Sequence, residues 1–136
     1  MLNNIQKEII YLMVTFLMSD KYTLIYSSDT ISFYIETSKT IFIPTGAVYL
    51  EFVIKKNYQI SKSTSISRWD WKYSKILKII LPNKKHNNFN EFWENFNSKE
   101  VKENNQSCLE WFNTINSIID ENKLYICLTT LLINNI

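Results

Sequence analysis

The single histidine of this chain, His86, is the residue whose type most readily supplies acid–base or metal chemistry near neutral pH. A general base needs a partner that orients it, and it usually lies in a cleft. His86 instead lies within residues 83–88, and the remaining five residues of this segment are asparagines and lysines. We therefore expect His86 to be solvated and to have no catalytic role.

The two cysteines and the single glycine argue against further kinds of chemistry. Cys108 and Cys127 have apolar neighbours and no Cys-x-x-Cys or Cys/His spacing that would indicate a metal site. Phosphate-binding loops need several glycines, because the backbone must approach the phosphate closely, and this chain has only Gly46. An AT-rich coding sequence, indicated by many isoleucines, asparagines and lysines, accounts for part of that deficit. The sequence predicts no metal and no cofactor, and we expect the protein not to be an enzyme.

Carboxylates could also perform acid–base chemistry, and they are concentrated near the C-terminus. Residues 90–136 carry seven acids and three lysines, a balance of −4, whereas residues 1–89 carry twelve basic and six acidic residues, a balance of +6. A catalytic pair must face each other across a site, which this spacing does not indicate. Ordinary solvated faces are one interpretation. The other is an acidic helical face that binds a basic protein, with charge steering the encounter. Its residues would be Glu91, Glu94, Glu100, Glu103, Glu110, Asp120 and Glu121.

The alternating segment at residues 68–73 is a second candidate surface for binding a partner. It consists of Arg68, Trp69, Asp70, Trp71, Lys72 and Tyr73. Trp, Tyr and Arg are enriched at interface hot spots, and a guanidinium can bind a carboxylate with two parallel hydrogen bonds. Three aromatic residues on one face of a strand could equally belong to the core. Basic residues interleaved with aromatic ones also occur on platforms for single-stranded nucleic acid.

The elements that must position these residues begin with a helix near residues 4–18, which Asn3 or Asn4 can cap. After Lys21 the apolar period changes to two, which predicts strands. The predicted strands are Tyr22–Tyr26, Ile31–Glu36, Thr40–Ile43, Ala47–Lys55, Arg68–Tyr73 and Lys75–Leu81. The sequence Pro44-Thr45-Gly46 predicts a turn that uses the glycine at positive φ.

Helical periodicity returns at residues 89–96. Ser107 and Glu110 fit a capping box, which predicts a helix that starts there and ends near Asn122. Residues 124–133 are β-branched and apolar, so they could form a strand or a short buried helix, and we favour the strand. The whole chain, residues 1–136, is predicted to be one α+β domain. It would have an N-terminal helix, an antiparallel meander sheet of five or six strands, and C-terminal helices packed on one face.

The apolar stretch Ile9–Met18 is the segment most similar to a signal or membrane sequence. Its ten residues are too few to span a bilayer, and Ser19-Asp20-Lys21 is not a small-residue cleavage site. We therefore expect a cytoplasmic protein without membrane contact.

These features favour a small, non-enzymatic, protein-binding inhibitor. Specifically, we predict a bacterial immunity protein that neutralises a cognate toxin, and a nuclease is a suitable toxin because nucleases that grip phosphate are often basic. One alternative is a module that binds single-stranded nucleic acid through the basic, aromatic side of the sheet. Another is a small-ligand-binding or enzymatic domain with a pocket between the sheet and the helices. The sequence identifies neither the partner nor the oligomeric state.

Overall fold

The fold is a sheet of long antiparallel strands covered on one face by helices. The computed structural model describes residues 1–17, 23–28, 31–44, 46–61, 68–82, 85–96 and 104–134. The helices are α1 (Asn4–Leu17), α2 (Phe89–Phe96), α3 (Asn104–Ile115) and α4 (Glu121–Asn134). The strands are β1 (Thr23–Ser27), β2 (Ile31–Ile43), β3 (Ala47–Ser61) and β4 (Arg68–Pro82). The predicted α+β class and the antiparallel meander are confirmed.

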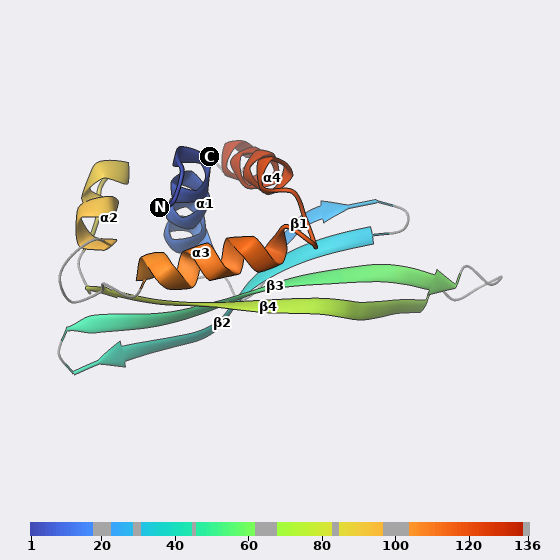
Figure 1. Ribbon diagram of the computed structural model, residues 1–136, viewed down its shortest axis with the longest axis horizontal. Coiled ribbons are helices and arrows are strands. Elements are labelled where there is room, and N and C mark those ends of the chain that lie inside the picture. The colour runs from blue at the N-terminus through green and yellow to red at the C-terminus, as the bar shows by residue number, and fades with distance from the viewer. Residues whose placement is uncertain are drawn as a thin grey trace.

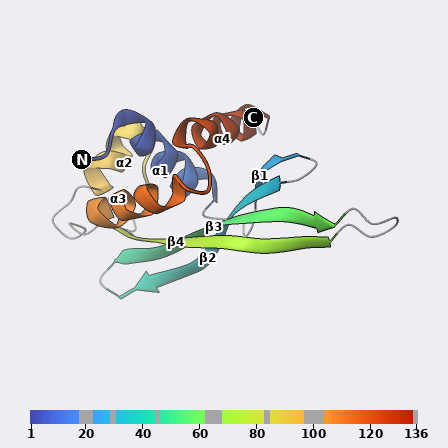
Figure 2. The same cartoon turned by 45° about the vertical axis from the view of Figure 1, so that its right-hand side comes forward.

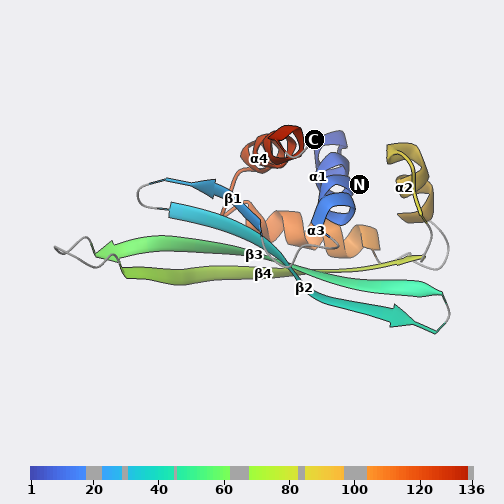
Figure 3. The same cartoon turned by 180° about the vertical axis from the view of Figure 1, so that it is seen from behind.

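The strands pair in chain order, β1-β2-β3-β4, and every pair is antiparallel. Figures 1 and 3 show the helices together on one side of this sheet. Figure 2 shows that β3 and β4 extend past the helices at the end where β3 stops and β4 starts. The predicted placement of the C-terminal helices on one face is therefore confirmed.

Two long strands replace four of the shorter segments predicted from sequence, so the described residues form four strands. Ile31–Glu36 and Thr40–Ile43 are parts of one strand, β2, whose register with β3 shifts between Thr37 and Lys39. Such a bulge adds one residue on one side and reverses the alternation of faces beyond it. A change of phase in the sequence therefore marks a bulge here and not a turn. In the same way the segments at 68–73 and 75–81 are both parts of β4.

The core lies between the sheet and the helices. From the sheet it takes the alternate residues of β3 and β4, which the register places on one face: Val48, Leu50, Phe52, Ile54, Leu77, Ile79 and Leu81. From the helices it takes Ile9, Met13, Phe92, Phe96, Phe112, Ile115, Leu124 and Leu128, among others. The strand predicted over Ala47–Lys55 therefore lies within β3, and one set of its alternating residues faces the core.

The start of α1 agrees with the prediction that an asparagine caps it. The Gln6 N–H donates to Oδ1 of Asn3 over 2.8 Å, and the Asn3 N–H donates to Oε1 of Gln6 over 3.0 Å. This reciprocal pair is a capping box, which satisfies amide groups that the first helical turn leaves without a partner.

The C-terminal part differs from the prediction in three respects. Helix α3 begins at Asn104, so Ser107 lies inside it and does not cap it. The predicted single helix to Asn122 is interrupted by a turn, in which the amides of Ile118 and Ile119 both donate to the carbonyl of Ile115. Residues 124–133 belong to helix α4 and not to a strand.

The physical reason for the last difference is burial at helical spacing. Leu124 and Leu128 are one turn apart and both face the core, and Asp120 caps the helix by accepting the Asn122 N–H over 2.6 Å. Tertiary contacts therefore override the β propensity of this segment.

Candidate functional site

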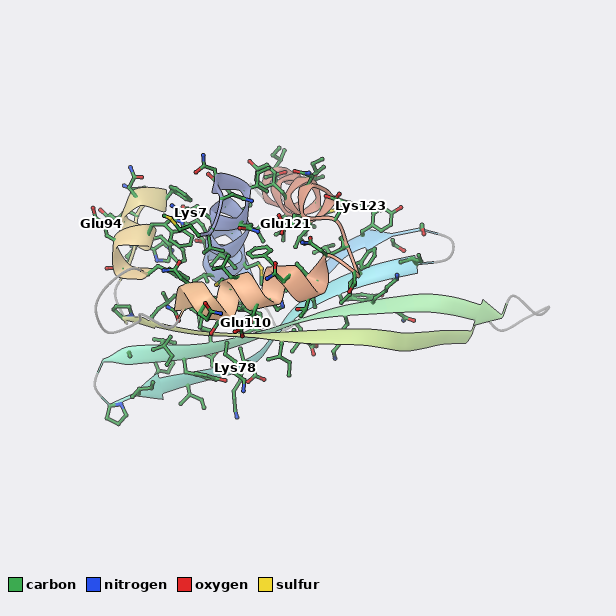
Figure 4. All side chains as sticks on the ribbon, in the orientation of Figure 1. Lys7, Lys78, Glu94, Glu110, Glu121 and Lys123 are labelled. Carbon is green, nitrogen blue, oxygen red and sulfur yellow. The ribbon has the colours of Figure 1, made fainter. Side chains whose placement is uncertain are left out.

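The face of the sheet opposite the helices, which we call the outer sheet face, carries both apolar and charged side chains. The register brings its residues together in three cross-strand rows. The rows are Ile41, Tyr49 and Ile80; Lys39, Glu51 and Lys78; and Glu36, Val53 and Ile76. In Figure 4 the labelled Lys78 points away from the helices.

Three isoleucines of the outer sheet face are exposed to solvent. The exposed fractions are 45% for Ile41, 54% for Ile76 and 37% for Ile80. Val53 is only 6% exposed although no described helix lies over it, because the side chains around it cover it. The exposed isoleucines thus lie on both sides of the charged row of Lys39, Glu51 and Lys78. Exposed apolar side chains grouped on one face are typical of a surface that makes contact with another molecule.

Both carboxylates of this face, Glu36 and Glu51, have a partner on the sheet. Nζ of Lys55, on β3, lies 2.7 Å from Oε1 of Glu36, and the Tyr49 hydroxyl donates to Oε2 of Glu51 over 2.9 Å. Burial is the main cause that raises the pKa of Tyr49. The hydrogen bond that Tyr49 makes with Glu51 and the negative charge of Glu51 raise it further. The Lys55–Glu36 pair is partly exposed, so it adds little stability and instead fixes the two side chains in place.

The predicted acidic residues lie on three helices and not in one cluster. Figure 4 shows Glu94, Glu110 and Glu121 at separate places, on α2, α3 and α4. Glu94 and Glu110 are exposed, whereas Glu121 is half-buried. Glu100 and Glu103 lie outside the residues that the structure describes.

Three of these acidic residues accept hydrogen bonds at the starts of helices. Oε2 of Glu91 accepts the Asn87 N–H over 2.9 Å where α2 begins, and Asp120 caps α4. Oε1 of Glu121 accepts hydrogen bonds from the side-chain amides of Gln6 and Asn116, so it joins α4 to α1. Carboxylates are favoured at helix N-termini by the helix dipole. These roles account for part of the acidic bias of residues 90–136.

The predicted aromatic segment, residues 68–73, lies in β4, but its side chains are outside the described part of the structure. Its backbone pairing is described, and the register shifts between Lys56 and Asn57. Tyr73 pairs with Lys56, and Trp71 pairs with Asn57. Neighbouring residues of β3 thus pair with residues two apart on β4. This bulge interrupts the strict alternation from which we expected the three aromatic residues to lie on one face of the strand.

His86 is half-buried, so the expectation of a solvated side chain is wrong. Its Nε2 lies 3.2 Å from the Thr15 hydroxyl of α1, and its ring lies 5.1 Å from that of Phe92 and 6.0 Å from that of Tyr11. Edge contacts between such rings are favourable, so the histidine joins the start of α2 to α1.

The cysteines are free and partly or fully covered. Burial raises the pKa of Cys108 to about 12, and burial also raises the pKa of Cys127, opposed by the charge of Lys123. Among the described residues no three His, Cys, Asp or Glu side chains lie close enough to hold a metal ion. In the same part of the chain, no helix has the length and apolar character needed to cross a membrane.

Comparison with protein-family models, with curated proteins and with solved structures gives no match. The outer sheet face was not among the sites predicted from sequence. The sequence pattern that could have indicated this face lies in residues 76–81, where apolar residues occupy both alternating sets of positions. Ile76 and Ile80 therefore fall on the face opposite Leu77 and Ile79.

Proposed function

We propose that this chain is a non-enzymatic protein-binding domain that recognises its partner through the outer sheet face. The observation that carries the proposal is the exposure of Ile41, Ile76 and Ile80 around the charged row of Lys39, Glu51 and Lys78. Apolar residues supply the free energy of association, and fixed charges select the partner and its orientation.

The specific form of the proposal is an immunity protein that neutralises a toxin by occupying its surface. The separation of charge along the sequence supports a basic partner, and Glu51, in the central row of the outer sheet face, is a carboxylate that such a partner would meet. Core side chains such as Phe52, Phe92 and Phe112 fill the middle of the space between the sheet and the helices, which favours recognition on the surface over a ligand held between the layers.

Affinity capture from cells of the source organism tests the proposal. The tagged full chain is compared with a variant that carries Ile41→Glu, Ile76→Glu and Ile80→Glu. A matched control carries Ile126→Glu and Ile133→Glu, because these are exposed isoleucines on α4, away from the sheet. We expect a protein retained in stoichiometric amount by the wild type and the control, and lost with the sheet variant.

The captured protein then tests the inhibitor role. We expect its production alone to stop growth and its co-production with the wild-type chain, but not with the sheet variant, to restore growth. The absence of a stoichiometric protein would overturn the proposal, and so would a partner that the sheet variant binds as tightly as the wild type. Retention of a single-stranded oligonucleotide that falls with salt would favour the nucleic-acid alternative instead.

A further inference from the structure

Strand β4 forms one edge of the described sheet, and a side chain of α3 already pairs with it as a neighbouring strand would. The Ile80 N–H donates to Oδ1 of Asn104 over 3.0 Å, and Nδ2 of Asn104 donates to the carbonyl of Ile80 over 2.6 Å. Asn104 is buried, with 4% of its surface exposed. One amide side chain thus replaces the backbone of a further strand at this position.

The same edge continues from Ile80 toward the start of β4, where no described residue takes the place of Asn104. In an antiparallel pair, the N–H and C=O of alternate residues point to one side of the strand. The register with β3 is continuous from Pro82 to Lys75, so Lys78 and Ile76 present their amides on the same side as Ile80. No group of the described residues hydrogen-bonds those backbone amides at Lys78 and Ile76.

A groove of about 330 Å³ follows this part of the edge. Ile76 and Lys78 form its strand side, and Ser107, Glu110, Trp111 and Thr114 form its helix side. Figure 4 shows Glu110 on α3 beside the sheet and Lys78 below it. The groove therefore combines backbone groups that no described residue pairs, an apolar wall and one charge of each sign.

We infer that this edge binds an extended segment of a partner protein, which adds a strand to the sheet beside β4. The inference rests on the proposed function in that the chain binds another protein. Backbone hydrogen bonds at Ile76 and Lys78 give the segment its direction and register, as in other cases of strand addition. An acidic side chain of the segment pairs with Lys78 on the outer sheet face, because opposite charges on adjacent strands attract.

A second copy of this chain fits the edge less well than a single extended segment. Two copies of β4 paired about a two-fold axis would lie about 4.8 Å apart, whereas packed helices need about 8–10 Å between their axes. Each copy of β4 carries its own α3 on the same side of the joint sheet, so the two helices would compete for one space. A lone strand has no such helix.

Selection of short random peptides displayed on phage against the immobilised full chain tests the inference. A selected peptide is then synthesised with one N-methyl group at each residue in turn. Strand addition requires hydrogen bonds from alternate residues of the peptide. We therefore expect N-methylation to weaken binding by about tenfold at every second position and to have little effect between them.

Two substitutions at one residue locate the peptide on the protein. Lys78→Pro removes the outward N–H at an edge position where proline is tolerated, whereas Lys78→Thr keeps it. We expect the proline variant to bind the selected peptide at least about tenfold more weakly than the threonine variant, with circular dichroism confirming that both fold.

Other outcomes overturn the inference. They are a failure to select any peptide, equal binding to the two Lys78 variants, and a methylation profile without alternation. In each of these cases Asn104 and Lys78 would serve only to protect the edge from pairing with another strand. Ile126→Glu, on α4 and away from both the groove and the outer sheet face, is expected to bind the peptide normally. If Ile41→Glu, on the outer sheet face, loses the peptide while the proline and threonine variants bind it equally, the peptide binds the face and not the edge. A captured protein partner without any selected peptide would sink this inference and leave the proposed function standing.

Discussion

At the scale of single residues, Asn104 joins the helix layer to the edge of the sheet. Both polar atoms of its side-chain amide are bonded to Ile80, and the residue is almost fully buried. A side chain that pairs with both backbone groups of one residue has geometry that no apolar substitute can reproduce. The start of α3 is therefore held in register with β4 by a polar contact and not by packing alone.

We expect Asn104→Ala to lower the free energy of unfolding by about 2 kcal/mol, since it removes two hydrogen bonds at a buried position. Urea denaturation measures this change. Amide hydrogen exchange of Ile80 is expected to accelerate in the same variant. Asn113→Ala is the matched control, because Asn113 lies exposed on the same helix. Equal midpoints for the two variants would show that the bonds to Ile80 contribute nothing to stability.

Cys108 gives the protein a predicted sensitivity to alkaline pH. Burial raises its pKa from 9.0 to about 12, so folding favours the protonated thiol. This contribution is fully present below pH 9 and is lost as the pH rises toward the folded-state pKa, because the unfolded chain then releases its proton first. We expect the free energy of unfolding to fall by up to about 1.4 kcal/mol for each pH unit in this range.

Urea denaturation of the wild type and of Cys108→Ala, at several pH values from about 8 to about 10, isolates that contribution. The pKa values of Tyr49 and Cys127 are also raised, and both residues remain in the variant, so only the difference in slope belongs to Cys108. The variant is expected to be less stable at pH 8 but to lose stability less steeply. Parallel slopes would mean that the thiol of Cys108 has no raised pKa.

At the scale of elements, the sequence predicted what depends on local periodicity. The cap of α1 at Asn3 and the alternation of β3 are local patterns, and both occur in the structure. The extent of β2 was not predictable, since a bulge at Thr37 and a turn both interrupt a period of two. The strand favoured for residues 124–133 is a helix because its environment, and not its propensity, decides its conformation.

The candidate site shows the same division between local and long-range information. The sequence indicates that Ile76 and Leu77 face opposite ways in β4, but it does not indicate which face the helices cover. That choice depends on the placement of α1, α3 and α4 after the chain has passed through the whole sheet. The exposed isoleucines could therefore not be separated from the buried ones by pattern alone.

The hairpin between β2 and β3 depends on the single glycine. Gly46 has a φ of +86°, and its N–H donates to the carbonyl of Ile43 over 3.0 Å. We expect Gly46→Ala to destabilise the protein by about 1 kcal/mol, because this φ strains residues with a Cβ. A Cβ at this position would meet no atom within 4 Å, so the cost is conformational and not steric.

Gly46→Asn is the matched control, since asparagine adopts positive φ more readily than alanine does. Urea denaturation is expected to rank the variants as glycine, then asparagine, then alanine in decreasing stability. An alanine variant as stable as the wild type would show that the hairpin rearranges to a turn without positive φ.

At the scale of the whole molecule, the described helices cover one face of the sheet, and none of them lies over the other face (Figure 3). An antiparallel sheet can face water on one side, but that side is then usually polar. Here it holds Ile41, Ile76 and Ile80. The arrangement places the core on one face of the sheet and leaves these isoleucines of the other face exposed.

This separation predicts that the outer sheet face can be made polar without loss of the fold. We expect the combined variant Ile41→Thr, Ile76→Thr and Ile80→Thr to change the free energy of unfolding by no more than about 1.5 kcal/mol in total, because threonine suits strands and exposed substitutions cost little. The same variant is expected to bind less of a hydrophobic dye such as ANS, since the exposed apolar surface is smaller.

Ile79→Thr, one residue away from Ile80 but on the opposite face, is the contrasting control. Ile79 is 1% exposed, and its substitution leaves a cavity and buries a hydroxyl in the core. We expect a loss of about 2–4 kcal/mol in urea denaturation, more than the three outer substitutions together. If the outer variant instead unfolds as readily as Ile79→Thr, the isoleucines of the outer sheet face belong to the stability of the isolated chain. They would then not be free to bind a partner, and the proposed binding face would have to lie elsewhere.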